Sequence, residues 1–167
     1  MKQIPLTQGQ YALVDDADYV WLNQWKWCAF ECRDYFYAIR RSIRTNEDGK
    51  HYLIYMHRQI LGLGYGDPRQ GDHIDHNTLD NSRDNLRICT HQENLRNRKS
   101  SQNTSSQFKG VCWDKQYQKW QVDISINGKH KKLGRFAVEK EAALAYDAAA
   151  IREFGEFAYL NFNQNNT

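Results

Sequence analysis

Residues 71–77 have the sequence GDHIDHN, and this stretch decides how the first half of the chain is interpreted. Asp72 and His73 are adjacent within it. Asn85 follows twelve positions after His73, and Asn94 lies nine positions further on. An acid, an imidazole and two amides at this spacing can form a metal site with a general base beside it. Such a site is suited to hydrolysing a phosphodiester, which requires an activated water and stabilisation of charge on phosphate oxygens.

Two of these side chains are candidate metal ligands. Asp72 offers a carboxylate oxygen and Asn94 offers an amide oxygen. Hard oxygen donors suit Mg²⁺ or Mn²⁺ better than they suit zinc. Two protein ligands leave the other coordination positions to water and to a substrate phosphate. The sequence therefore predicts a magnesium or manganese site at these two residues.

His73 is the candidate general base. An imidazole whose pKa lies near neutrality accepts a proton from water, provided that a partner holds its other ring nitrogen. We expect the amide oxygen of Asn85 to be that partner. Adjacent residues of a regular strand point to opposite faces, so a kink or a strand end must bring Asp72 and His73 into one cleft.

These residues resemble the signature of the HNH (ββα-metal) endonucleases over about residues 52–98. The resemblance implies that Asp72 and Asn94 bind the metal. It also implies that His73 is the general base and that Asn85 orients it. The fold expected from the resemblance is a pair of strands followed by a helix. His57 and Arg58 lie where members of the family often carry a similar pair, for which we expect a packing role.

The second half of the chain carries four further runs, namely FKGV at 108–111, KLGRF at 132–136, EAALAYDAAA at 141–150 and LNF at 160–162. Together they resemble the plant ethylene-response-factor (apetala-type) DNA-binding domain over residues 106–162. The resemblance implies a three-stranded antiparallel sheet backed by one helix, with the sheet lying in the major groove of DNA. The plant domains carry arginine where this chain has Cys112 and Ser125, so the target sequence cannot be transferred from them.

The residues of 119–126 alternate between apolar and polar side chains. We expect the apolar set to face the helix; it comprises Trp120, Val122, Ile124 and Ile126. We expect the polar set to face outward, where glutamine can read adenine and aspartate can accept from cytosine; it comprises Gln121, Asp123 and Ser125.

Positive charge is concentrated in the middle of the chain. Residues 96–135 carry ten Lys/Arg and two Asp/Glu, a balance of +8 in a chain whose formal net charge is +3. A basic block of this kind indicates a polyanion partner, although a solvated charged surface is the alternative. We expect base or phosphate contacts from Arg87, Arg96, Arg98, Lys99, Lys109, Trp113, Gln121, Asp123, Ser125, Lys129, His130, Lys132 and Arg135. For Trp113 a place in the core is an equal alternative.

The expected fold class is α+β. We predict a β-rich segment and an HNH nuclease at residues 1–98 with its core at 52–98, a linker at 99–107 and the DNA-binding domain at 108–163. The predicted strands are 72–76, 86–89, 108–113, 119–126 and 129–136, with helices at 55–63 and 138–154. Asn127-Gly128 is typical of a two-residue hairpin turn, and Gly155 of a helix C-terminus.

These features predict a site-selective, Mg²⁺-dependent homing-type endonuclease that cuts double-stranded DNA. We expect a monomer with no small-molecule substrate and no membrane partner, so that one strand is nicked per encounter. The sequence has no apolar run that could span a bilayer and no export signal, which favours the cytoplasm of a phage-infected or host bacterial cell. A non-catalytic, sequence-specific DNA-binding regulator is the alternative. An RNA-directed nuclease is a lesser one, because the major groove of RNA is too narrow for the sheet.

Overall fold

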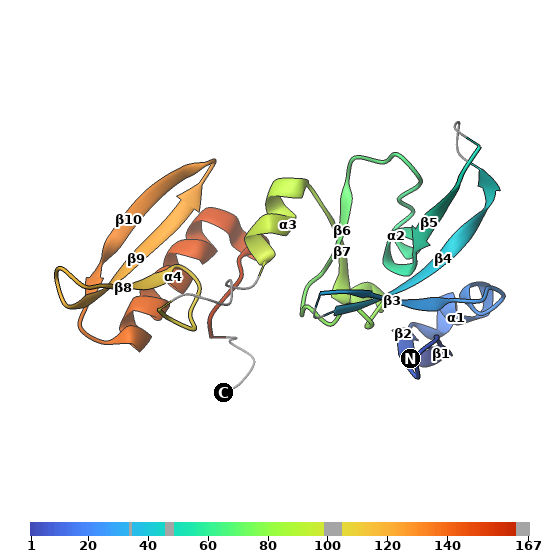
Figure 1. The fold of residues 1–167 in the computed structure, drawn as a ribbon, viewed down its shortest axis with the longest axis horizontal. Helices are drawn as coiled ribbons and strands as arrows, with labels where there is room; N and C mark the ends of the chain where they lie inside the picture. Colours follow the sequence, from blue (N-terminus) through green and yellow to red (C-terminus); the bar gives the residue numbers. More distant parts are fainter. Residues whose placement is uncertain (34, 46–48, 99–104, 163–167) are drawn as a thin grey trace. The chain divides into compact units, whose positions relative to one another are not determined.

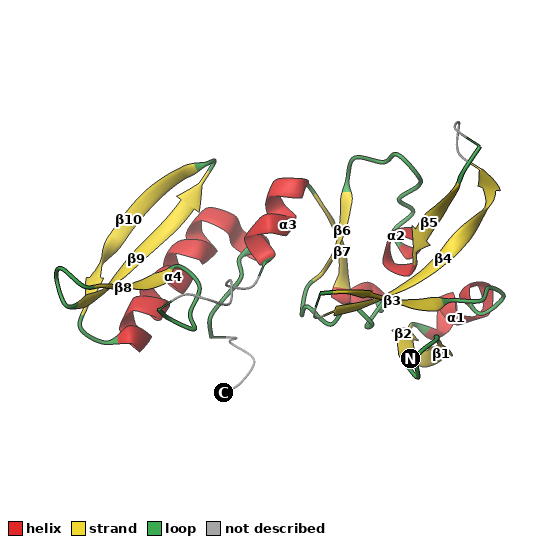
Figure 2. Ribbon diagram, viewed as in Figure 1, coloured by secondary structure: helices red, strands yellow, loops and turns green. Residues whose placement is uncertain are grey.

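Helices and small antiparallel sheets follow one another along the chain (Figure 1). The computed structural model describes residues 1–33, 35–45, 49–98 and 105–162. The chain divides into two compact units, Met1–His91 and Gln92–Thr167. Figure 2 shows that each unit combines helices with strands, which confirms the predicted α+β class.

The first unit begins with a hairpin and a short helix. Strand β1 (Lys2–Pro5) pairs antiparallel with β2 (Tyr11–Val14), and α1 (Asp16–Leu22) follows. The sequence predicted a β-rich segment here, and α1 interrupts it. Asp15 adopts an extended conformation immediately before the helix. The negative charges of the acidic residues in the first turn stabilise the helix by interacting with the positive end of its dipole. Leu22 is buried at the end of the helix.

A three-stranded antiparallel sheet forms the middle of the first unit. Its strands are β3 (Cys28–Cys32), β4 (Tyr35–Thr45) and β5 (His51–Tyr55), hydrogen-bonded in that order. Helix α2 (Met56–Ile60) follows β5 directly and is shorter than the predicted helix at 55–63. Gly62 has a φ of 71°, a left-handed conformation that ends the helical path.

The last pair of strands in the first unit carries the GDHIDHN motif. Strand β6 (Gln70–His73) pairs antiparallel with β7 (Leu86–Cys89), and the 3₁₀ turn η1 (Arg83–Asn85) leads into β7. The prediction for β7 is confirmed, whereas the strand predicted at 72–76 begins earlier and ends at His73. The chain turns after His73, and His76 has a φ of 68°, which no regular strand residue adopts.

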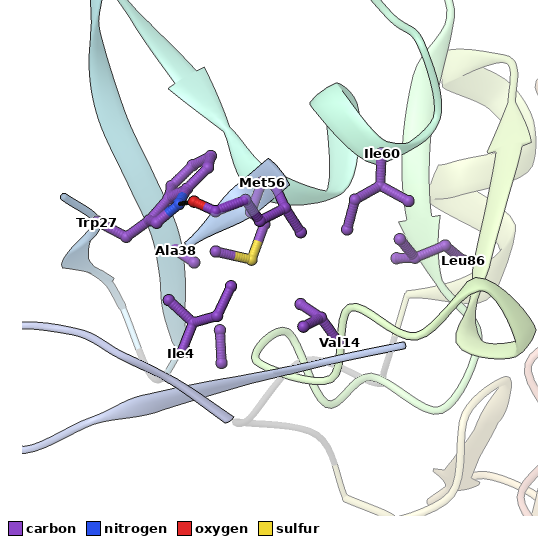
Figure 3. Packing of buried hydrophobic residues seen from close by; sticks show 9 residues of the cluster. Ile4, Val14, Trp27, Ala38, Met56, Ile60 and Leu86 are labelled. Atoms are coloured by element: carbon purple, nitrogen blue, oxygen red, sulfur yellow. Dashed lines mark hydrogen bonds between the residues drawn. The ribbon is translucent and has the colours of Figure 1, made fainter. Parts of the chain in front are cut away.

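Side chains from six of these elements meet in one core, which fixes the position of the motif (Figure 3). Met56 of α2 and Leu86 of β7 are both part of it, so the helix and the strand pair are anchored to the same cluster. Trp27 closes one end of the core, and its indole N–H donates to the carbonyl oxygen of Leu22 at 2.9 Å.

The second unit has a sheet covered by a helix. Helix α3 (His91–Asn97) starts at the boundary, and its residues from Gln92 onward belong to this unit. Strands β8 (Val111–Asp114), β9 (Lys119–Ile126) and β10 (Lys129–Phe136) form an antiparallel sheet with β9 in the middle. Helix α4 (Glu139–Phe154) packs on the sheet, and the 3₁₀ turn η2 (Gly155–Phe157) follows (Figure 2).

The sequence pattern of the second unit is confirmed in its main features. Val122 and Ile124 are buried against the alanine-rich face of α4, and Trp120 and Ile126 pack at the edge of the same core. Positive φ angles at Asn127 and Gly128 form the predicted two-residue turn between β9 and β10. The strand predicted at 108–113 starts later, at Val111.

Candidate functional site

Asp72 and His73 lie at the C-terminal end of β6, and both are buried, with 7% and 5% exposure. The carboxylate of Asp72 is paired with Arg87, which lies directly opposite on β7. Arg87 donates from Nε at 2.9 Å and from Nη2 at 2.7 Å, both to Oδ2 of Asp72. The side chain of Arg87 is only 11% exposed. The sequence placed Arg87 at a substrate phosphate, but cross-strand register pairs it with the candidate metal ligand.

Burial keeps His73 neutral near pH 7. Removal from water lowers the pKa of the His73 imidazole, and Asn81 and nearby carboxylates oppose that effect only in part. Nε2 of His73 lies 3.4 Å from Oδ1 of Asn81. An amide oxygen only accepts hydrogen bonds, so this contact places the proton on Nε2 and the basic lone pair on Nδ1. The ring is therefore in a form that can accept a proton.

Asn85 does not hold His73, contrary to the expectation from sequence. Its amide oxygen accepts the backbone N–H of Asp75 at 3.0 Å, and its amide nitrogen donates to the carbonyl oxygen of Asp80 at 2.9 Å. Both contacts lie in the loop between β6 and β7, so Asn85 fixes the shape of that loop. The physical reason is the start of the turn immediately after His73, which brings loop backbone to Asn85.

Asn81 is the site residue that sequence reasoning missed. Its side chain is 1% exposed, and besides the contact with His73 it donates to the carbonyl oxygen of Leu79 at 3.1 Å. The loop between β6 and β7 is rich in Asn and Asp, and this composition was the only sign in the sequence that an amide side chain of the loop could contact His73. The sequence did not indicate which of them would do so.

His57 packs against His73 from α2. The two ring centroids are 4.9 Å apart in an edge-on arrangement, and Tyr37 borders both rings at 5.9 and 6.2 Å. Burial, followed by the nearby His73 and Arg58, lowers the pKa of His57 to about 3. A methyl group on Gly71 would lie 2.7 Å from Cδ2 of His57, so glycine permits this close approach. The packing role expected for His57 is confirmed, and the ring it packs against is the candidate base.

Asn94 lies on α3 in the second unit and is half-buried, whereas Asp72 belongs to the first unit. Within the described residues, no group of three or more His, Cys, Asp or Glu side chains is arranged to hold a metal. The candidate ligands are one carboxylate and one amide, a hard oxygen pair that leaves most coordination positions to water. Mg²⁺ prefers such a set, so the chemistry of the donors fits the ion.

Most predicted base-reading side chains lie on the outer face of the second unit's sheet and contact one another. Gln121 donates to Oδ2 of Asp123 at 2.6 Å, and the Ser125 hydroxyl lies 2.9 Å from Nδ1 of His130. These pairs hold polar groups in fixed positions on the face away from α4. The exposed lysines of β10 that were predicted to contact phosphates are Lys129 and Lys132.

Two predicted contacts in the second unit are held by protein partners. Arg135 donates from Nε to Asp114 at 2.9 Å and stacks on the ring of Tyr117. Trp113 packs edge-on against Trp120, with ring centroids 5.0 Å apart, and is half-buried. This packing favours the core alternative for Trp113.

Lys109 has a different role from the predicted phosphate contact. Its ammonium donates to the carbonyl oxygens of Arg96 and Arg98, both at 2.6 Å, at the C-terminus of α3. Burial, with the charge of Arg98 nearby, lowers the pKa of Lys109 to about 8. The guanidinium of Arg96 lies 4.8 Å from the ring centre of Phe154. Lys99, also predicted to contact DNA, lies outside the described residues.

A broad groove of about 880 Å³ lies within the second unit. It is lined by residues of α3, α4, the sheet and the β9–β10 turn, and by residues that precede the sheet. Its basic side consists of Arg96, Arg98 and Lys109. Asp123, Ser125 and His130 of the outer sheet face line it as well. The groove therefore brings cationic groups next to the side chains that were predicted to read bases.

Comparison with known proteins supports the presence of an HNH endonuclease domain in the chain. Residues 49–96 match the family model of the HNH endonucleases. The chain is 38% identical over 90 residues to an uncharacterized HNH endonuclease of Acanthamoeba polyphaga mimivirus, which covers 54% of this chain and 46% of the relative. It is 38% identical over 58 residues to Protein 3.8 of Escherichia phage T7, covering 35% of this chain and 48% of that protein.

The plant resemblance also has a counterpart among known proteins. The chain is 39% identical over 66 residues to APETALA2-like protein 2 of Oryza sativa subsp. indica, covering 40% of this chain and 15% of the plant protein. The chain thus spans about half the length of the viral relatives and a small part of the plant one. These matches support an HNH endonuclease domain, and with it a nuclease. In the part of the chain that the structure describes, no helix has the length and apolar character needed to cross a membrane.

Proposed function

We propose that the chain is a site-selective, metal-dependent endonuclease of the homing type that hydrolyses phosphodiester bonds in double-stranded DNA. The observation that carries the proposal is a buried, neutral His73 beside the carboxylate of Asp72 within a segment that matches the HNH endonucleases. The match favours an enzyme over a regulator, because the acid and the imidazole that catalysis needs are both present.

In this proposal each side chain of the candidate site has a defined task. Nδ1 of His73 accepts the proton of the attacking water, while Asn81 holds the N–H at Nε2. Asn85 keeps the loop between β6 and β7 in the shape that presents His73. Asp72 and Asn94 are the proposed ligands of Mg²⁺ or Mn²⁺. When bound, the ion supplies positive charge that stabilises the phosphate oxygens and the departing alkoxide.

The second unit supplies DNA binding in this proposal. The three-stranded sheet with its polar outer face has a shape that fits a major groove, which admits β-ribbons. The basic groove lined by Arg96 and Arg98 supports binding of the phosphate backbone. The protein is expected to act as a monomer, and one active site then nicks one strand per encounter.

The experiment is a metal-dependence assay with supercoiled plasmid. We expect conversion to nicked circles with Mg²⁺ or Mn²⁺ and none in the presence of a chelator. A mobility-shift assay on the same DNA in chelator should show binding. DNA binding without metal-dependent nicks would support the regulator instead, and competition by duplex RNA would support an RNA-directed enzyme. Sequencing of the cut ends should reveal a preferred site.

A further inference from the structure

A second concave site lies in the first unit on the other side of α2 from His73. Its volume is about 460 Å³, which is in the usual range for small-ligand pockets. His57 of α2 contacts His73, whereas Gln59 lines the pocket. Residues two apart on an α-helix differ by about 200° in direction, so the two side chains leave α2 on opposite faces.

One wall of the pocket is a pair of aromatic rings, of which one is half-buried and the other exposed. The ring centroids of Tyr52 and Tyr65 are 4.4 Å apart, and Tyr65 is 65% exposed. The loop that carries Tyr65 is held by Arg58, which donates to the carbonyl oxygens of Gly64, Asp67 and Arg69 at 3.2, 3.2 and 2.8 Å. The fold thus keeps a large aromatic side chain in place at the surface instead of burying it.

The polar side of the pocket is equally fixed. The Arg40 guanidinium lies 4.4 Å from the ring centre of Trp25 and 5.5 Å from that of Trp27. Arg40 donates from Nε to Oε1 of Gln59 at 3.2 Å and from Nη1 to the carbonyl oxygen of Arg41 at 3.3 Å. Neither Nη2 of Arg40 nor Nε2 of Gln59 has a hydrogen-bond partner among the described residues. Planar N–H donors therefore remain for a ligand.

These surroundings define the chemistry of the ligand. The floor is apolar and contains Leu63 and Ile54, and the charged residues of the lining that the structure describes are the arginines Arg40 and Arg58. A flat aromatic ring with hydrogen-bond acceptors, attached to an anionic chain, matches the tyrosine wall, the donors and the positive charge. A nucleotide base has all of these properties.

We propose that this pocket binds one unpaired base of the DNA substrate, stacked against Tyr65 and bonded by Arg40 and Gln59. The assignment of DNA as the source of the base rests on the proposed function. A base in a continuous duplex is stacked on both faces and paired at its edge, so only an unpaired or extruded base offers its face to the pocket. The pocket would then hold a nucleotide about one helix diameter from His73, roughly 10 Å.

The test uses the full chain in chelator, so that it does not depend on cleavage. An oligonucleotide with a single 2-aminopurine is presented as a single strand, as a one-base bulge in a duplex, and fully paired. We expect the protein to quench the fluorescence of the first two. Tyr65→Ala should weaken their binding by roughly five- to a hundredfold, because base stacking on an aromatic side chain contributes that much. Tyr65→Phe should retain binding.

Tyr11→Ala is the matched control, because Tyr11 is also an exposed tyrosine, at 53%, and does not line the pocket. Thermal unfolding of each variant checks that it folds. If Tyr65→Ala bound the oligonucleotides as tightly as the wild type does, or if Tyr11→Ala lost as much affinity as Tyr65→Ala, the assignment of this pocket as a base-binding site would be wrong. If the free 2-aminopurine mononucleotide bound as tightly as the single-stranded or bulged oligonucleotide, the pocket would bind free nucleotides and the assignment of DNA as the source of the base would be wrong. If the protein had no nuclease activity but still bound the unpaired base more tightly than Tyr65→Ala does, only the proposed function would be refuted.

Discussion

Asp72 and Arg87 form a buried ion pair across β6 and β7, in which two guanidinium nitrogens share one carboxylate oxygen. The candidate metal ligand is therefore neutralised by a protein cation. A buried carboxylate without a counter-charge is costly, and Arg87 supplies that counter-charge and holds Asp72 in place. A bound cation would be a second source of positive charge at the same carboxylate.

This pair predicts a metal-dependent change in stability. Arg87→Met should lower the free energy of unfolding in chelator by about 3 kcal/mol, since it removes the guanidinium that faces the buried carboxylate. Adding Mn²⁺ should recover part of the loss in this variant. Urea denaturation with and without Mn²⁺ measures both effects. Arg69→Met, which removes an exposed ion pair with Asp67, is the control and should change little. Equal stability of Arg87→Met and wild type in chelator would contradict the account.

The contact between His57 and Gly71 predicts a suppressor relationship. Gly71→Ala places a methyl group 2.7 Å from His57 and 3.0 Å from Leu61, so the His57 ring, which packs against the candidate base, has to shift. We expect the cleavage rate to fall between about ten- and a hundredfold with little change in DNA affinity, as for a misplaced catalytic group. Single-turnover cleavage and mobility shift separate the two.

Combining Gly71→Ala with His57→Ala provides the control for that prediction. The smaller side chain makes room for the added methyl group, so the double variant should cleave no more slowly than His57→Ala alone. Strictly additive losses in the double-mutant cycle would show that the two residues act independently.

The sequence predicted the regular elements better than the contacts of the site. Strands β7, β9 and β10 were predicted at their observed positions because alternating side chains and a turn signal define them locally. Strand β6 was shifted because its end depends on a turn stabilised by Asn85, which is distant in sequence. The signature placed Asp72 and His73 together at one strand end. It did not reveal Asn81 or the pairing of Arg87, because both depend on cross-strand register and burial.

Lys109 illustrates the same limit in the second unit. Composition placed it among the basic side chains that face a polyanion. Its observed partners are two backbone carbonyls, one in the last turn of α3 and one just after the helix, and such contacts leave no trace in a local sequence pattern. Burial of an ammonium group is favourable only where such acceptors compensate for the lost hydration.

The contact of Lys109 gives a prediction that separates a structural role from a phosphate contact. Lys109→Met should lower the stability of the second unit by about 1–2 kcal/mol and speed hydrogen exchange in α3, since a cation at a helix C-terminus is lost. The dependence of DNA affinity on salt should keep its slope. Lys129→Met, at an exposed position on β10, should instead reduce that slope by about one. A reduced slope in Lys109→Met would show that the lysine contacts phosphate.

The low pKa of His57 predicts acid sensitivity. The pKa is about 3 in the folded chain and about 6.5 when unfolded, so below pH 6.5 only the unfolded state gains this proton. The contribution is fully present above pH 6.5 and is lost as the pH falls toward 3, at up to about 1.4 kcal/mol per pH unit. Urea denaturation from pH 7 to pH 4 measures the slope. His57→Gln should show a shallower decline, and an unchanged slope would contradict the buried, neutral state.

The most direct test of the central claim is single-turnover cleavage of plasmid DNA by His73→Ala in Mg²⁺, alongside His51→Ala. His51 lies on β5 and is exposed, so its replacement controls for the loss of any histidine in this unit. The account predicts that His73→Ala binds DNA as wild type does and cleaves at least a hundredfold more slowly, while His51→Ala remains active. Full cleavage by a folded His73→Ala protein would contradict the assignment of His73 as the base.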